Sequence, residues 1–236
     1  MRRLVRRGDT VFDIGANTGL YARFLVQVFG AERVVCFEPM AGNLDLLHQN
    51  LALGGIEGRV RVLSVALADR EGREALQADD FGSATAALEV VTGGRPSESH
   101  RQYGLPGRRE IVEVAPLDAL VERFNLPAPN VLKIDVEGAE AIVLRGARRT
   151  IMRHRPRLAI ELHGPATAQQ VLPLVHELGY RVWAHGFEDW KHVYRPAGPH
   201  DADGLGDSRW MAYHFVVASD EAADVERPIE PYGSPG

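Results

Sequence analysis

The chain has 236 residues, of which 45% are hydrophobic and 25% are charged. This length and composition are typical of one soluble domain with a single core. A net charge of −5 and a pI near 6.0 argue against a nucleic-acid surface, which would show a basic face. No run approaches the roughly 18 apolar residues of a membrane span, and no signal-length apolar run follows the basic first residues. With Cys36 as the single cysteine, we expect a cytoplasmic protein without disulfides.

Short apolar runs alternate with helical patterns along most of the chain. Helical spacing of apolar residues is seen at 20–28, 44–51 and 171–178, and another helix is expected from about residue 139. The expected strands are 10–14, 33–37, 60–66, 130–135 and 157–162, followed by two closing strands at 180–183 and 211–217. Helices between successive strands predict a largely parallel sheet with right-handed connections.

Three segments depart from this alternation, within a predicted single domain over residues 1–218. Residues 77–109 are rich in glycine and proline without a sustained period, which fits either a substrate lid or a disordered loop. Residues 185–209, rich in Gly, Pro, His and Asp, are expected to form a loop. Residues 219–236 are acidic and then proline-rich, so we predict a disordered tail.

The first strand runs into a glycine turn, Asp13-Ile-Gly-Ala-Asn-Thr-Gly19. Gly15 and Gly19 remove Cβ atoms where the backbone bends sharply or lets a ligand approach. The turn is not the dinucleotide fingerprint, because Asn17 replaces the required second glycine. We therefore favour a compact ligand with an amino acid end, whose ammonium group would suit the Asp13 carboxylate.

Glu38 ends the second strand, 19 residues beyond Gly19. A carboxylate at this distance from a glycine turn is placed to accept both hydroxyls of a ribose. Pro39 stops the strand and fixes the turn that presents Glu38. The pair predicts a nucleoside-binding position next to the glycine turn.

Four motifs occur in the order of one known family: Asp13 to Gly19, Phe37-Glu-Pro39, Leu132-Lys-Ile-Asp-Val-Glu-Gly-Ala-Glu140 and Ile160-Glu-Leu-His163. In these motifs the chain resembles the FkbM family of S-adenosylmethionine-dependent methyltransferases. The resemblance implies an α/β fold of the Rossmann-like class I type, with helices on both faces of a seven-stranded, mostly parallel sheet. The implied strand order is 3-2-1-4-5-7-6, with strand 7 antiparallel.

The resemblance also implies S-adenosyl-L-methionine as cofactor and O-methylation of a sugar, glycolipid or natural-product hydroxyl. Asp13, Gly15, Asn17 and Gly19 would surround its methionine end, and the end of the third strand at Ala66 would border its adenine. Its ribose would be held by Glu38, with Pro39 shaping the turn and Asn43 assisting from the next helix.

Four titratable residues follow two neighbouring strands at their carboxyl ends, where open α/β sheets bind ligands: Asp135, Glu137, Glu161 and His163. Methyl transfer to a hydroxyl requires alignment of the acceptor oxygen and removal of its proton. We therefore predict these four as catalytic residues. Glu140 falls in the first turn of the next helix, where a carboxylate complements the helix dipole, and is expected to be structural.

His163 is the first choice of general base, because an unperturbed imidazole titrates near neutral pH. Asp135 or Glu161 would orient its other ring nitrogen. The alternative is that His163 only bonds backbone at a strand end. Lys133 alternates with Asp135 along the strand, so it is expected to pair with a nearby carboxylate.

Several alternatives to this function stay open at this point. A divalent metal is possible but not expected; Asp135, Glu137 and Glu161 would supply its oxygen ligands. The acceptor could be a nitrogen of a small molecule or peptide, and the chain could be a cofactor-binding partner protein without catalysis. Nucleotide-dependent oxidoreduction is disfavoured by the missing glycine.

Overall fold

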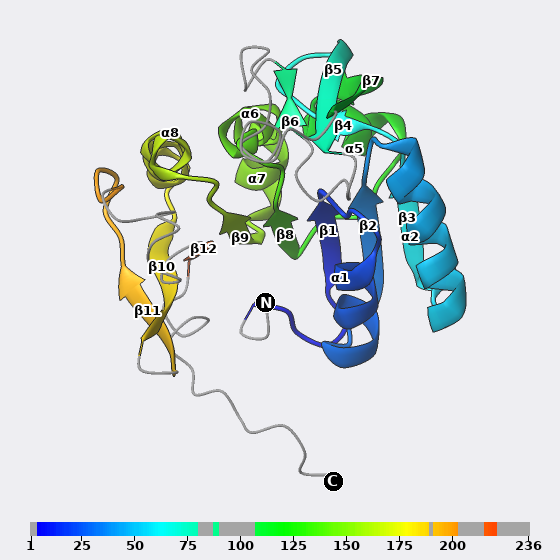
Figure 1. The fold of residues 1–236 in the computed structure, drawn as a ribbon. Coiled ribbons are helices and arrows are strands. Elements are labelled where there is room, and N and C mark those ends of the chain that lie inside the picture. The colour runs from blue at the N-terminus through cyan, green and yellow to red at the C-terminus, as the bar shows by residue number, and fades with distance from the viewer. Residues whose placement is uncertain (1–3, 80–86, 90–106, 189–190, 203–214, 221–236) are drawn as a thin grey trace, which may run out of the picture.

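The computed structural model describes residues 4–79, 87–89, 107–188, 191–202 and 215–220 (Figure 1). A mixed β-sheet forms its centre, with helices against both faces. A second, smaller sheet lies beyond the carboxyl ends of β1 (Thr10–Ile14) and β2 (Arg33–Phe37) (Figure 1). The two sheets together frame the pocket described below.

Among the described residues, eight strands form the main sheet in the order β11-β10-β12-β9-β8-β1-β2-β3. Besides β1 and β2, these strands are β3 (Val60–Leu63), β8 (Val131–Ile134), β9 (Arg157–Glu161), β10 (Arg181–Glu188), β11 (Lys191–Pro196) and β12 (Phe215–Ser219). The seven expected strands keep the expected order, and β12 pairs antiparallel with both β9 and β10. The Rossmann-like prediction is confirmed, and β11 adds an eighth strand at the edge.

The strand β11 overturns the predicted loop at 185–209. β10 continues to Glu188 and pairs antiparallel with β11, from Trp183 opposite Pro196 to Glu188 opposite Lys191. The rings of His185 and Tyr194 pack across this pair with centroids 4.7 Å apart. The polar and aromatic composition of residues 185–188 and 191–196 does not show the apolar pattern of a buried strand. They nevertheless form a hairpin at the edge of the sheet, where β11 pairs with one neighbouring strand. Residues 203–209 of the predicted loop and 211–214 of the last expected strand lie outside the described part.

Period-two alternation along the strands divides the core into two layers. On one face, Val11 and Cys36 pack under the first helices; on the other, Phe12 and Ile134 pack under the later helices. The first group is α1 (Leu20–Arg23), its π-helical continuation (Phe24–Val28) and α2 (Ala41–Gly54), followed by a 3₁₀ turn (Glu57–Arg59). The second group is α5 (Leu117–Arg123), α6 (Glu140–Gly146), α7 (Arg148–His154) and α8 (Pro165–Glu177).

The smaller sheet contains β4 (Ala66–Leu67), β7 (Gly107–Ala115), β5 (Gly72–Asp79) and β6 (Ala87–Leu88), in that order. Where it is described, the segment 77–109 contributes the end of β5, the strand β6 and the start of β7, so it is not a disordered loop there, and the lid stays a prediction. Residues 80–86 and 90–106 lie outside the described part. The expected third strand also ends early, at Leu63, and Ala66 joins the smaller sheet.

Apolar side chains and one backbone contact hold the smaller sheet in place. Leu76, Leu88 and Val112 pack against Met40 and other buried residues next to the main sheet. Glu110 of β7 accepts a hydrogen bond from the backbone N–H of Ala41, 3.2 Å away at the start of α2. The smaller sheet thus forms a wall attached to α2.

The predicted disordered tail does not begin at residue 219. Ser219 closes β12 opposite Arg181, and the Asp220 carboxylate forms an ion pair with Arg155. Residues 221–236 lie outside the described part of the chain.

Candidate functional site

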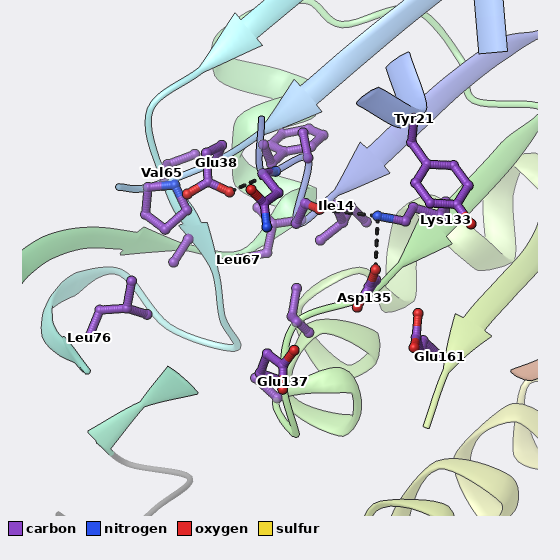
Figure 2. A pocket seen from close by; sticks show the side chains of 18 of the residues that line it. Ile14, Tyr21, Glu38, Val65, Leu67, Leu76, Lys133, Asp135, Glu137 and Glu161 are labelled. Atoms are coloured by element: carbon purple, nitrogen blue, oxygen red, sulfur yellow. Dashed lines mark hydrogen bonds and ion pairs between the residues drawn. The ribbon is translucent and has the colours of Figure 1, made fainter. Parts of the chain in front are cut away.

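A cavity of about 580 Å³ opens at the carboxyl ends of β1, β2, β8 and β9. This volume is in the usual range for a small-molecule site. Figure 2 shows Glu38 at one end, Asp135, Glu161 and Lys133 at the other, and Leu76 of the smaller sheet below Glu38. Of the predicted site residues, the lining contains Gly15, Asn17, Glu38, Pro39, Ala66, Asp135, Glu137, Glu161 and His163.

The glycine turn after β1 is set by protein contacts. Gly15, Asn17 and Gly19 all have left-handed backbone angles, with φ of 76°, 49° and 77°. A Cβ at Gly15 would lie 1.8 Å from the Asp135 carbonyl oxygen, and one at Gly19 would lie 3.0 Å from Leu47 Cγ. Both glycines are thus required by backbone conformation and packing, which supports the first of the two predicted reasons, a sharp bend of the backbone. Gly19 is not part of the lining.

Glu38 is 4% exposed and holds together the turns at its end of the cavity. Its Oε2 accepts from the Asn17 backbone N–H at 2.9 Å, and its Oε1 accepts from the Met40 N–H at 2.9 Å and Asn43 Nδ2 at 3.1 Å. Burial raises the pKa of Glu38, while these three bonds lower it. Since a carboxylate has about four acceptor positions, these bonds leave capacity for a ligand hydroxyl.

Two predicted cofactor contacts lie behind the cavity wall instead of lining it. Asn43 is 2% exposed and bonds Glu38, so it acts through that carboxylate. Asp13 is 0% exposed, and its Oδ1 lies 3.1 Å from the Lys133 Nζ. Asp13 is therefore the partner of a buried lysine and does not face a ligand ammonium.

Lys133 connects the two strand ends that form the cavity floor. Its Nζ donates to the Gly15 carbonyl at 3.1 Å and lies 3.3 Å from Asp135 Oδ2, in addition to its contact with Asp13. Burial opposes the ammonium charge, but Asp13 and Asp135 outweigh it and raise the pKa of Lys133. Lys133 thus pairs with carboxylates, as predicted, and its ammonium lies 4.9 Å from the centre of the Tyr21 ring.

His163 is surrounded by carboxylates from the β8–α6 region. Its Nδ1 lies 2.7 Å from Glu140 Oε1, while its Nε2 lies 3.4 Å from Glu137 Oε1 and 3.7 Å from Asp135 Oδ1. A tight turn with φ of 51° at Glu137 and 96° at Gly138 brings these groups together. The carboxylate at hydrogen-bond distance from Nδ1 is that of Glu140, whereas the sequence had suggested Asp135 or Glu161 as the partner of the ring.

The charges in this cluster also change the predicted base. Burial lowers the pKa of His163, but hydrogen bonds with Glu137 and Glu140 outweigh it and raise the pKa to about 11. An imidazolium has no lone pair with which to take a proton, so in this charge state His163 would not serve as the general base expected from the sequence. Burial and the nearby Asp135 raise the pKa of Glu161 to about 7, against the opposing effect of His163 and Lys133. Glu161 fits that role better.

The same cluster contains side chains of the kind that bind metal ions. Asp135, Glu161 and His163 each offer a ligand atom, all within 4.8 Å of one another, whereas the predicted set had Glu137 in place of His163. A metal would require neutral imidazole. The His163 ring is instead held protonated by Glu140 and Glu137, and Lys133 already neutralises Asp135. The donor set therefore does not favour a cation of this kind.

Sequence reasoning missed several lining residues: Leu20, Tyr21, Leu46, Leu76, Leu88 and Val136. Leu20 and Tyr21 were detectable, because they follow directly on the glycine turn at the start of α1. Leu76 and Leu88 were not, because their strands were not predicted.

Residues 13–182 match the sequence profile of a family described as "Methyltransferase FkbM domain". The chain belongs to this family. The FkbM match extends from the glycine turn to β10 and so includes every lining residue of the cavity. The resemblance seen in the four motifs is thereby confirmed.

Two curated relatives from bacteria give a measure of the similarity. The chain is 26% identical over 155 residues to the 2-O-methyltransferase NoeI of Sinorhizobium fredii, covering 64% of this chain and 63% of NoeI. It is 28% identical over 199 residues to the 31-O-demethyl-FK506 methyltransferase FkbM of Streptomyces tacrolimicus, covering 76% of this chain and 75% of that protein.

A solved structure supports the fold of this FkbM-family chain. The methyltransferase FkbM from Methylobacillus flagellatus superposes with a TM-score of 0.54 at 22% identity, covering 89% of this chain. Only 43% of that protein is matched. At this identity the likeness shows the fold alone. No described helix combines the length and apolar character needed to cross a bilayer.

Proposed function

We propose that the chain is an S-adenosylmethionine-dependent O-methyltransferase acting on a hydroxyl of a sugar, glycolipid or natural product. Membership of the FkbM family and the O-methyltransferase names of its relatives support methyl transfer. The observation that carries the proposal is the pairing of Glu38 at one end of the cavity with the Asp135, Glu161 and His163 cluster at the other.

The charge of the cavity fits a cationic cofactor. Four carboxylates line it, from Glu38, Asp135, Glu137 and Glu161, whereas Lys133 and His163 are the lining cations in the described chain. When bound, S-adenosylmethionine would supply an activated methyl group on a positively charged sulfur. Glu38 would accept from ribose hydroxyls, and Asn17 and the Gly15 backbone would lie at its amino acid end.

The apolar part of the lining fits the cofactor's base. Ala66 and Leu67 form β4 of the smaller sheet directly after Val65, and Leu76 and Leu88 add an apolar wall from the same sheet. Such surfaces suit a flat heteroaromatic ring, because removing the faces of the ring from water contributes favourable binding free energy without a charged partner. The small sheet is thus part of the proposed adenine site.

The acceptor proton is assigned to Glu161. A carboxyl whose pKa is about 7 is ionised in a substantial fraction of molecules at neutral pH and still basic enough to take a proton. The cofactor would supply the methyl carbon to the acceptor oxygen and keep the electron pair of the broken carbon–sulfur bond, while Glu161 would take the proton that the hydroxyl releases.

His163 is assigned a different part in the same step. As an imidazolium it can only donate, and its Nε2 is the ring nitrogen on the side of Asp135 and Glu137. A hydrogen bond from Nε2 to an oxygen of the acceptor would fix the acceptor against Glu161. Orientation of this kind accounts for a large share of the rate in bimolecular reactions.

Calorimetric titration with S-adenosylhomocysteine tests the cofactor, with NAD as the matched control because Glu38 could serve a ribose of either. Saturable binding of S-adenosylhomocysteine alone is expected. Transfer of labelled methyl groups from S-adenosylmethionine is then measured on hydroxylated acceptors and on their amino analogues. Binding of NAD instead, or no binding of either, would refute the proposed cofactor, and methylation of amines alone would refute the acceptor class.

A further inference from the structure

We propose that Glu140 is a positioning residue, whose buried carboxylate holds the His163 ring with Nε2 facing the acceptor end of the cavity. The importance of this contact for turnover rests on the proposed function. The contact between Glu140 and His163 does not depend on the proposed function, and it can be measured without any cofactor or acceptor.

The geometry of Glu140 supports a dedicated contact. Its side chain is 0% exposed, and its Oε1 lies 2.7 Å from His163 Nδ1 and accepts the Gly138 backbone N–H at 3.1 Å. Its Oε2 is buried and has no hydrogen-bond partner among the described residues. A buried carboxylate is costly unless it is paired with a cation and hydrogen-bonded. The His163 ring is the group that meets both needs.

A carboxylate that caps a helix start bonds backbone N–H groups of that helix, as Asp118 of α5 does for α7 beside an ion pair with Arg149. Asp118 accepts the backbone N–H groups of Arg149 and Thr150, at 2.9 Å and 2.8 Å, in the first turn of α7. Glu140 stands in the first turn of α6 but directs its Oε1 to the side chain of His163, which lies between β9 and α8. A helix-dipole role, which we predicted from sequence, explains the position of Glu140 and leaves its contact with His163 unexplained.

The contact fixes which ring nitrogen faces the cavity. With Nδ1 engaged by Glu140, Nε2 is left for the cavity, where it meets Glu137 and Asp135. The backbone on the other side is also held, because the Thr167 hydroxyl donates to the His163 carbonyl at 3.1 Å. The bond made by one imidazole nitrogen generally sets the role of the other.

NMR titration of the His163 ring tests the contact directly. The Glu140→Gln variant keeps the shape and an acceptor oxygen but removes the charge, and the His163→Gln spectrum assigns the signal. Glu137, Asp135 and Glu161 also face the ring and remain in place. We expect the pKa of His163 to fall by about one unit or more, which is about a tenfold loss of proton affinity. The exposed Glu177 on α8 supplies the control, because Glu177→Gln should leave that pKa unchanged.

Kinetics then separates positioning from folding. In Glu140→Gln, kcat should fall about tenfold or more, while the dissociation constant of S-adenosylhomocysteine stays within about twofold of the wild type. Glu140→Asp, which keeps the charge on a shorter side chain, should recover part of the His163 pKa. An unchanged His163 pKa in Glu140→Gln would overturn the proposal whether or not the chain methylates anything.

A folding failure of the variants would not leave the question open. In the wild-type chain, the bond to Glu140 predicts a downfield Nδ1 proton of His163 that exchanges slowly with water. Its absence from a wild-type spectrum in which the other buried protons are seen would equally overturn the proposal. If the proton is present but no methyl transfer occurs, the contact stands and the proposed function fails.

Discussion

Removal of the Glu38 carboxylate should weaken cofactor binding and also destabilise the turns that this side chain holds. In Glu38→Ala, the donors Asn17 N–H, Met40 N–H and Asn43 Nδ2 all lose their acceptor. The ligand hydroxyl loses a bond to a charged group, worth about 1.5–3 kcal/mol. That range corresponds to roughly a 10- to 150-fold rise in the dissociation constant.

The assay is calorimetric titration of both proteins with S-adenosylhomocysteine. Glu57→Ala is the control, because it removes an exposed glutamate from the 3₁₀ turn after α2. Thermal unfolding without ligand shows whether the freed donors also destabilise the turn. Equal affinity of wild type and Glu38→Ala would refute the argument that this carboxylate binds the ribose.

Four further outcomes follow from the same contacts. Turnover should rise with pH through about 7 as Glu161 loses its proton. Glu161→Gln should lower kcat by roughly 10²–10⁴-fold and abolish this rise of turnover with pH. If the rise remained in the variant, the general base would be another residue. Folding raises the pKa of Glu161 from 4.5 to about 7, so the folded chain binds more protons between these values and loses stability as pH rises through them. Glu161→Gln should therefore raise the melting temperature above about pH 7 but not below about pH 4.5, and an equal shift at both would contradict this linkage. Lys133→Met leaves Asp13 buried without its cation and should cost about 3–5 kcal/mol of unfolding free energy in denaturant titration; a neutral result would mean that Asp13 is protonated. Gly15→Ala places a Cβ against the Asp135 carbonyl and should cost about 3 kcal/mol or more in the same assay, whereas Gly58→Ala, in open space, should not.

The main sheet was predictable because its strands carry continuous apolar runs. β1, β2 and β8 are buried on both faces, and their residues read as strands without any tertiary information. The smaller sheet gives no such signal. β5 and β7 carry charged pairs such as Arg73 with Glu113, so their alternation is hidden until the strands are seen together.

The site divides in the same way. Glu38 and the cluster after β8 and β9 were predictable, because strand ends of a parallel sheet meet at one edge. The side-chain partners of these residues were not predictable, since several of the carboxylates could pair with either Lys133 or His163. The contact of Glu140 with His163 goes together with the turn at Glu137 and Gly138, whose left-handed backbone angles the sequence alone did not show.

Lys133 gives the cavity a means of communication between its two halves. A single ammonium group holds the Gly15 carbonyl in the turn after β1 and the Asp135 carboxylate after β8. A ligand that bonds Asp135 and moves it away would leave the Lys133 ammonium paired with the turn after β1. A ligand that changes the conformation of the turn would alter the electrostatic field at Asp135. If a ligand in one half shifted this ammonium group, affinity in the other half would change, and thermodynamic reciprocity would make the two changes equal. Donor and acceptor would then bind as a cooperative pair.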